Sequence, residues 1–317
     1  MKYGGEIWGS NKMAVTGKIL TDAQQEQFWR DGYLVMDGAV DDVTLARLRQ
    51  QMDDWGEESR GHTEPYGPPT VDGRPRFDMG EEHSSERPAL RRINNPCEIS
   101  ENFHAVMTNA PMVDMVADLI GPDVKYHHCK INSKQPGSKM VVRYHQDFPY
   151  TPHTNDDVIT ALLLLDDVDE ENGCLMVVPG THRGTIDSLF QGDTFTGMVA
   201  PALEQDYMAR QVPIEGRAGS VCLMHTRLQH GSEANLSTNR RRGIYICVYS
   251  AADAVPIARN PMPSTLEGTI VRGEASRTAR MIPLQVELPQ QPKSASFFTV
   301  IGQKSAGTSG DGCDGND

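Results

Sequence analysis

The sequence predicts a mainly β protein with flanking helices, whose core is a double-stranded β-helix of the jelly-roll or cupin-like type. From Val124 to about Ser250, short apolar runs alternate with turn-forming pairs such as Asn172-Gly173 and Pro179-Gly180. Helical periodicity precedes this stretch, and no repeat with a period of roughly 20–50 residues is visible. Strands this short at this spacing are typical of sandwiches and jelly rolls. The expected strands are Met140–Tyr144, Val158–Leu165, Cys174–Val178, Ser220–Met224 and Gly243–Ser250.

The composition indicates an acidic globular protein. Of 317 residues, 38% are apolar, and 43 Asp and Glu against 30 Lys and Arg give a formal net charge of −13. This charge argues against nucleic acid as a partner, since phosphate binding requires clustered Lys and Arg. The longest apolar run, Ala161–Leu165, is far too short to span a bilayer. The six cysteines are scattered without a CxxC pair, which predicts reduced thiols in a cytoplasmic protein.

We expect one domain over residues 17–300, because the chain shows a single β-rich stretch with helical patterns before it. Within it we expect a helical N-terminal part (17–122), a jelly-roll core (123–252) and a C-terminal part (253–300). Residues 1–16 are expected to form a flexible extension. Residues 301–317 are mostly Gly, Ser and Asp and are expected to be a disordered tail.

The N-terminal part contains clear helix signals. Thr21 followed by Gln24 matches a capping box, and Gly32 is placed to end that helix. Tyr33–Met36 is expected to be a short strand. A second helix is predicted from an apolar stripe at helical spacing, which we expect to pack into the core: Leu45, Leu48, Met52 and Trp55.

Residues 57–90 are rich in Pro and Gly and too long for a simple connector. This segment is expected to be either a lid that closes over a bound substrate or a fixed surface loop. Helical patterns resume at about Ser100–Val106 and at Pro111–Ile120, which starts with Pro and is followed by Gly121.

The tripeptide His145-Gln146-Asp147 is a candidate metal site. In an extended stretch alternate side chains share a face, so His145 and Asp147 would point the same way. An imidazole and a carboxylate are two parts of the 2-His-1-carboxylate triad of non-haem Fe(II) enzymes, which leaves positions open for a chelating co-substrate and O₂. Such tripeptides also arise by chance, and His145 would then be a core histidine and Asp147 a turn former.

A second histidine from a distant strand would complete the triad, and His230 is the strongest candidate. It ends a stretch that begins with the apolar run Ser220–Met224, as expected for a ligand at the rim of a barrel strand. It is followed by Ser232 and by three arginines, residues 240–242, which open the next strand. His225 is the rival ligand, but it lacks a downstream cation at comparable reach.

The arginines matter because a dicarboxylate that chelates the metal at one end needs a cation for its far carboxylate. Arg meets this need with a two-pronged set of donors. Arg241 lies 11 residues after His230, within reach through a hairpin to the neighbouring strand. Two of the three arginines are expected to be solvated turn residues.

These motifs resemble the phytanoyl-CoA dioxygenase family of Fe(II)- and 2-oxoglutarate-dependent oxygenases. The resemblance runs from about Leu20 to Ala252, and its motifs are highly specific when taken together and in this order. The strongest stretches are Asp31-Gly32-Tyr33-Leu34-Val35, His145-Gln146-Asp147, Glu171-Asn172-Gly173-Cys174-Leu175, Pro179-Gly180-Thr181-His182-Arg183-Gly184, and His230-Gly231-Ser232 through Arg241.

The resemblance implies roles for individual residues. Arg241, helped by Ser232, would hold the far carboxylate of 2-oxoglutarate. Arg92 matches a basic residue that the family often places near the co-substrate or substrate, although Arg91 is an equal candidate on spacing. The implied ligands of Fe(II) are His145, Asp147 and His230.

The resemblance also implies the reaction: hydroxylation of an unactivated C–H bond of a small molecule with O₂, and release of succinate and CO₂. Asp147 favours hydroxylation, because halogenases of this superfamily replace that carboxylate with a small residue. Leu162 stands where the acyl-CoA-hydroxylating member has a Trp, which argues against a CoA ester. Two alternatives stay open: a non-enzymatic jelly-roll protein that binds a metal or ligand, and a cupin-type isomerase or hydrolase. We expect neither a nucleic acid nor a membrane partner, and the oligomeric state stays open.

Overall fold

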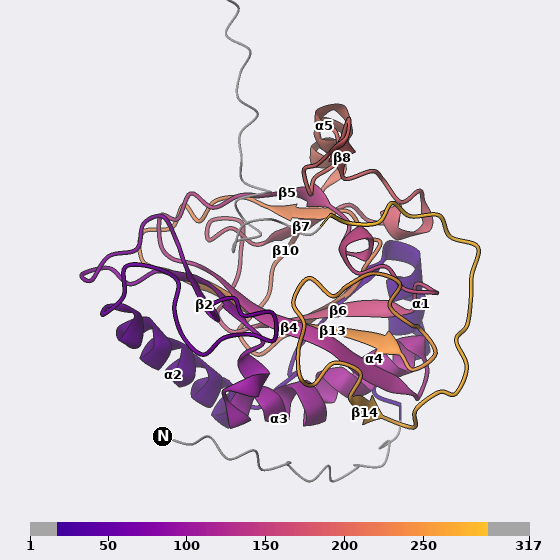
Figure 1. Ribbon diagram of the computed structural model, residues 1–317, viewed down its shortest axis with the longest axis horizontal. Coiled ribbons are helices and arrows are strands. Elements are labelled where there is room, and N and C mark those ends of the chain that lie inside the picture. The colour runs from indigo at the N-terminus through magenta and orange to yellow at the C-terminus, as the bar shows by residue number, and fades with distance from the viewer. Residues whose placement is uncertain (1–17, 291–317) are drawn as a thin grey trace, which may run out of the picture.

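The structure, a computed structural model, describes residues 18–290. Two antiparallel sheets are stacked, and helices cover the side of the larger sheet that faces away from the smaller one (Figure 1). This arrangement confirms the predicted mainly β architecture with flanking helices. The extension expected at 1–16 and the tail expected at 301–317 lie outside the described residues.

The larger sheet has the strand order β1-β11-β6-β13-β4-β3-β2, with β14 paired to β4. The two long strands β4 and β13 are antiparallel and pair along their length, with a register shift between Val248 and Tyr249. They therefore form the centre on which the rest of the sheet is built. The strands are β1 (Tyr33–Met36), β2 (Phe77–Met79), β3 (Leu90–Asn94), β4 (Val124–Lys134), β6 (Val158–Leu164), β11 (Val221–His225), β13 (Arg242–Ala251) and β14 (Ile270–Arg272).

The smaller sheet has the order β10-β7-β12-β5. In its β12–β5 pair, His230 lies opposite His145, so strand pairing alone brings together two histidines that are far apart in the sequence. A separate hairpin joins β8 (Phe190–Gln191) to β9 (Thr194–Phe195). The strands of the smaller sheet are β5 (Val142–His145), β7 (Leu175–Val177), β10 (Val212–Ile214) and β12 (His230–Ser232).

The helices that precede the β-rich core follow the predicted signals. Helix α1 (Asp22–Asp31) has the predicted capping box of Thr21 and Gln24, and it ends at Gly32, whose φ of 86° is one that Gly adopts without strain. None of the helices within residues 18–290 is long and apolar enough to cross a membrane. The other helices are α2 (Asp42–Ser59), α3 (Glu101–Asn109), α4 (Pro111–Ile120) and α5 (Pro201–Arg210).

The larger sheet has two faces in different surroundings. On the outer face, toward the helices, Tyr245 and Tyr249 of β13 join a large apolar core with Trp55 of α2. On the inner face, toward the smaller sheet, Ile244 and Ile246 of the same strand join a second apolar cluster. Because successive side chains of a strand alternate, a shift of one residue moves a side chain from one surrounding to the other.

The five expected strands are present, with ends shifted by at most two residues. Helix α5 was not predicted, and the strands that were not predicted individually are β2, β3, β4, β8, β9, β10, β12 and β14. Helix α5 buries Glu204 and Tyr207 but presents no apolar stripe, so periodicity does not reveal it. The segment 57–90 contains β2, and its Tyr66 pairs with Phe77, so part of this segment is built into the sheet. Whether the segment closes over a substrate stays a prediction.

Candidate metal centre and its cavity

His145, Asp147 and His230 converge between the two sheets. His145 ends β5 and His230 begins β12, and their ring centroids lie 4.3 Å apart. An extended conformation is expected for Asp147 from the sequence. The structure instead places Asp147 at the start of a 3₁₀ turn, with helical backbone angles (φ −71°, ψ −32°). Its Oδ1 still lies 3.7 Å from Nε2 of each histidine. The three ligand atoms lie within 4.8 Å of one another, so they could hold one metal ion.

Hydrogen bonds orient all three side chains. Nδ1 of His145 lies 2.8 Å from the carbonyl oxygen of Arg143, and Nδ1 of His230 lies 2.9 Å from that of Leu228. A carbonyl can only accept, so each Nδ1 carries the proton and each Nε2 keeps its lone pair for a metal. The hydroxyl of Thr160 donates to Oδ2 of Asp147 at 2.9 Å, which leaves Oδ1 available as a single-oxygen ligand.

The electrostatics favour the ligand forms of these groups. Burial, followed by the nearby imidazole of His145, lowers the pKa of His230 to about 4, so that this ring is neutral at neutral pH. Burial alone would raise the pKa of Asp147, but His230, the hydrogen bond with His145 and the charge of Lys130 hold it well below its usual value. The site therefore presents a carboxylate beside a neutral imidazole, and metal binding needs little proton release from either.

Gln146, between the two ligands, points the other way and is fully buried. Its side-chain nitrogen donates to the carbonyl oxygens of Thr185 (3.2 Å) and Arg227 (2.6 Å). Its side-chain oxygen accepts from the backbone N–H of Asp187 at 2.9 Å. Gln146 thus ties the turn between the ligands to two neighbouring loops.

A small cavity of about 40 Å³ lies beside Asp147. Sites for drug-sized ligands typically measure about 300–1,000 Å³, so this cavity suits a compact molecule. Its polar lining comes mainly from β3 and β4 and is basic in character. The lining includes Arg74, Arg92, Asn94, His128, Lys130 and Tyr150.

The structure distinguishes the two neighbouring arginines of β3. Arg92 is buried, lines the cavity beside Asp147, and donates from Nε to the side-chain oxygen of Asn132 at 3.3 Å. Burial lowers the pKa of Arg92 to about 10. Arg91 instead donates to both carboxylate oxygens of Asp78, at 2.9 and 3.2 Å, and does not line this cavity.

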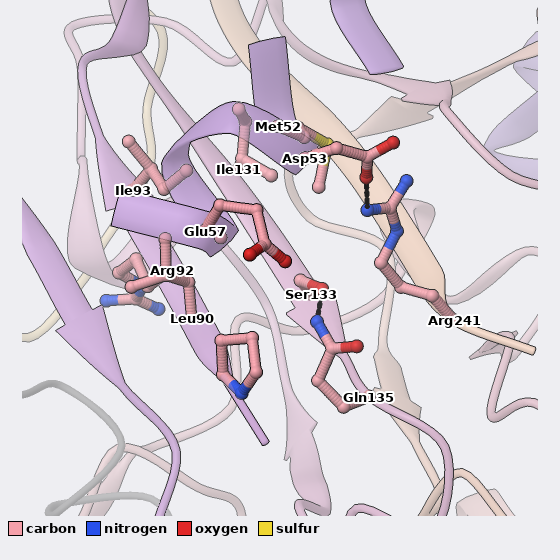
Figure 2. A pocket seen from close by; sticks show the side chains of 12 residues that line it. Met52, Asp53, Glu57, Leu90, Arg92, Ile93, Ile131, Ser133, Gln135 and Arg241 are labelled. Carbon is pink, nitrogen blue, oxygen red and sulfur yellow. Dashed lines mark hydrogen bonds and ion pairs between the residues drawn. The ribbon is translucent and has the colours of Figure 1, made fainter. Parts of the chain in front are cut away.

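Arg241 is placed differently from the expectation. Its guanidinium donates to both oxygens of Asp166, at 2.9 and 3.2 Å, and to Asp53 of α2 at 2.7 Å. Figure 2 shows this guanidinium turned toward Asp53, in a second pocket between α2 and the sheet. Arg241 therefore serves a structural ion-pair network on the outer face, and the structure does not bring it to the triad.

The next residue, Arg242, lies on the inner face. It is only 4% exposed and lies opposite Lys134 of β4. Within residues 18–290 its guanidinium makes no hydrogen bond or ion pair, and its Nε is buried without a partner. Burial lowers the pKa of Arg242 to about 10. A buried guanidinium without a hydrogen-bonded ion-pair partner is unfavourable, so this position is suited to an anionic ligand.

Ser232 lies beside these cations. Lys134 is fully buried, and its amine donates to the hydroxyl of Ser232 at 2.9 Å and to the carbonyl oxygen of Glu233. Burial, reinforced by the charge of Arg242, lowers the pKa of Lys134 well below its usual value. Ser232, Lys134 and Arg242 thus form one polar cluster on the inner face.

His225, the rival ligand, lies on the outer face. Its ring packs against Phe28 and Trp29 of α1, with centroid distances of 6.4 and 6.0 Å. Its Nδ1 accepts the backbone N–H of Arg227 at 3.1 Å. His225 is not part of the group of side chains that could hold a metal.

The two lysines of β4, Lys130 and Lys134, are not among the site residues that the sequence motifs predict. A signal was available, because every second residue from position 128 to position 134 is polar, and period-2 alternation predicts a strand with one polar face. The alternating polar residues are His128, Lys130, Asn132 and Lys134.

A jelly-roll core that holds two histidines and an aspartate is the architecture of a class of mononuclear metal proteins. The family model described as phytanoyl-CoA dioxygenase (PhyH) matches residues 28–243. The chain belongs to this family, which confirms the resemblance seen in its motifs.

Individual relatives agree with this assignment. The chain is 34% identical over 206 residues to the probable alpha-ketoglutarate-dependent hypophosphite dioxygenase of Stutzerimonas stutzeri, covering 63% of this chain and 71% of the relative. It is 28% identical over 243 residues to the peroxisomal phytanoyl-CoA dioxygenase of Homo sapiens, covering 74% and 70%. The crystal structure of EctD from S. alaskensis with bound Fe shares the fold, with a TM-score of 0.63, 20% identity, and coverage of 85% of this chain and 90% of that one.

Proposed function

We propose that this protein is an Fe(II)- and 2-oxoglutarate-dependent oxygenase that hydroxylates an unactivated C–H bond of a small molecule. O₂ is the second co-substrate, and succinate and CO₂ are released. The observation that supports this most directly is the convergence of two imidazoles and one carboxylate beside a basic cavity, in a chain of the phytanoyl-CoA dioxygenase family.

Nε2 of His145, Oδ1 of Asp147 and Nε2 of His230 would hold the iron. When bound, Fe(II) supplies the redox and Lewis-acid chemistry for oxidative decarboxylation of 2-oxoglutarate and for C–H oxidation. The protein fixes the donor set: backbone carbonyls orient the two rings, and the hydroxyl of Thr160 orients the carboxylate. Because Asp147 also lines the cavity, the substrate would approach from that side.

Arg242 is the residue that we propose for the far carboxylate of 2-oxoglutarate, with Ser232 and Lys134 beside it. This replaces the role expected for Arg241, whose donors are engaged by Asp166 and Asp53. A guanidinium can donate two parallel hydrogen bonds to a carboxylate. The bound carboxylate would also neutralise the buried charge of Arg242, so binding relieves an unfavourable state of the free protein.

Hydroxylation is favoured over the alternatives by the residues present. Asp147 supplies the carboxylate that a halogenase lacks. The buried cluster around Arg242 has a function if a dicarboxylate binds, whereas an isomerase, a hydrolase or an idle metal protein leaves it without one. Leu162 lies on the inner face opposite Ile246 and is buried in the apolar cluster. We still propose that the substrate is not a CoA ester.

Metal content and turnover test the proposal. Purified protein reconstituted with Fe(II) should bind about one iron per chain and convert 2-oxoglutarate to succinate with consumption of O₂. Addition of the true substrate should accelerate this conversion. Metal binding without 2-oxoglutarate binding would indicate a metal-binding jelly-roll protein, and product formation without O₂ uptake would indicate an isomerase or hydrolase.

We also propose a cytoplasmic location. The five cysteines within the described residues are buried free thiols, as expected for a protein of a reducing compartment. They are Cys97, Cys129, Cys174, Cys222 and Cys247. Fractionation of the native host, with antibody detection of this chain, tests the location.

A further inference from the structure

The cavity beside Asp147 carries positive charge that the iron and 2-oxoglutarate leave unmatched. Lys130 lies on β4 opposite Ile246 and lines this cavity. Within residues 18–290, Lys130 makes no ion pair with a carboxylate. The carboxylate that shares its cavity is Asp147, which is assigned to the metal.

Positive charge would exceed negative charge in the site even when Fe(II) and 2-oxoglutarate are bound. A bound Fe(II) adds two positive charges, which Asp147 and the metal-chelating carboxylate of 2-oxoglutarate match. The far carboxylate matches Arg242. Lys130 then remains without an anion of its own, next to Arg92, which lies opposite Asp78 and feels the charge of that carboxylate. The third basic residue there, Arg74, is paired with Asp72 at 2.6 Å.

Lys130 is too far along the sheet to bind the far carboxylate of 2-oxoglutarate beside Arg242. In the β4–β13 register, Lys130 lies opposite Ile246 and Lys134 opposite Arg242. The step of four positions from Lys130 to Lys134 spans roughly 13 Å of strand. The inner face thus presents two separate basic positions, one at Arg242 and one beside Asp147. Burial, and then the charge of Arg92, lowers the pKa of Lys130 to about 8.

We propose that the substrate carries a compact anionic group, of the phosphonate, phosphinate or carboxylate class, and that Lys130 binds this group next to the iron. This inference rests on the proposed function. The cavity supports a compact anion in two ways: its volume is about 40 Å³, and basic side chains from β3 and β4 form much of its wall. A charge-assisted hydrogen bond from a partly desolvated amine would favour an anion over a neutral molecule of the same shape.

Binding of methylphosphonate tests the inference without requiring turnover. Affinity is measured by calorimetry under anaerobic conditions, with Fe(II) and saturating 2-oxoglutarate present, and compared with that of the neutral dimethyl ester. The wild-type protein should bind methylphosphonate at least about tenfold more tightly than the ester. Lys130→Met should lose about ten- to hundredfold in affinity for methylphosphonate while 2-oxoglutarate affinity stays within about threefold. Lys130→Arg should retain most of the affinity, and Lys139→Met, at an exposed lysine outside the cavity, should behave like wild type.

Several outcomes would overturn the inference. Equal wild-type affinity for phosphonate and ester would show that the cavity does not select charge. An equal loss of 2-oxoglutarate affinity in Lys130→Met would assign Lys130 to the co-substrate. If Lys130→Met does not fold, Lys130→Gln and the wild-type comparison decide between these results. Failure of the wild-type protein to bind iron or 2-oxoglutarate at all would instead refute the proposed function.

Discussion

The inner and outer faces of the larger sheet use the same strands in opposite ways. On the outer face, the hydroxyls of Tyr245 and Tyr249 donate to the carbonyl oxygens of Phe103 (3.1 Å) and Met107 (2.8 Å), while their rings fill the core under the helices. On the inner face, Arg242 is buried without a partner. The outer face is therefore built for stability, and the inner face keeps a polar group in an unfavourable state that a ligand can relieve.

The same contrast separates three pairs of like residues. In each pair one member lies in the triad, at the cavity or, for Arg242, on the inner face opposite Lys134, and the other makes a structural contact elsewhere. The members near the site are His230, Arg242 and Arg92, and their structural counterparts are His225, Arg241 and Arg91. Residue type alone does not distinguish the members of a pair, so each pair supplies a matched control.

The largest effect is expected at the metal ligands. Asp147→Ala and His230→Ala should each abolish stoichiometric iron binding and reduce 2-oxoglutarate turnover to background, because only two donors would remain. His225→Ala should keep about one iron per chain. Metal analysis and succinate formation measure both properties. Retention of iron by His230→Ala, combined with its loss in His225→Ala, would reverse the assignment of the third ligand.

The next effect concerns stability. Tyr249→Ala removes a fully buried ring from the outer core and should lower the free energy of unfolding by about 3–5 kcal/mol. Arg242→Met removes an unpartnered buried charge from the inner face, so it should leave the free energy of unfolding unchanged or raise it. Denaturant unfolding of the metal-free proteins measures both values. A large destabilisation by Arg242→Met would mean that this guanidinium has a structural role.

The third effect concerns the co-substrate. Arg242→Gln should weaken 2-oxoglutarate binding by about 1.5–3 kcal/mol, which is roughly ten- to hundredfold in affinity. Arg241→Gln should leave this affinity within about threefold, yet it should lower stability by about 1–3 kcal/mol because Asp166 loses its main partner. Calorimetric titration with 2-oxoglutarate compares the two variants. The reverse order of affinities would return the co-substrate role to Arg241.

The smallest effect is a pH dependence. Burial lowers the pKa of His225 to about 3 and that of His128 to about 3, well below the usual value of about 6.5. Between about pH 6.5 and 4 the unfolded chain binds protons that these folded residues exclude, so stability falls as pH falls, by about 1.4 kcal/mol per pH unit for each group. In metal-free protein, His225→Asn should reduce this slope by about 1.4 kcal/mol per pH unit, which corresponds to one proton. An unchanged slope in unfolding experiments from pH 7 to 4 would contradict the expected effect of burial.

Much of the fold and of the metal centre is predictable from the sequence because the signals are local. Caps such as Thr21 and Gly32 act within one turn of a helix, so they mark its ends directly. The tripeptide His145-Gln146-Asp147 places two proposed ligands within three residues. Asp147 reaches its position through a 3₁₀ turn and not by strand alternation. His230 is predicted as the third ligand because it follows an apolar run and precedes Ser232 and three arginines, and strand pairing places it opposite His145.

The sequence by itself determined the family, the order of the main elements and the triad of His145, Asp147 and His230. Tertiary structure decided which arginine enters the core and which lysines face the cavity. The reason is that residues 240–242 are all arginine, so the local sequence is the same in either strand register and does not show which of them points inward. Only the packing of β13 against β4 and β6, with Tyr245 outward and Ile244 inward, selects the register that turns Arg242 toward the inner core and leaves Arg241 with Asp166.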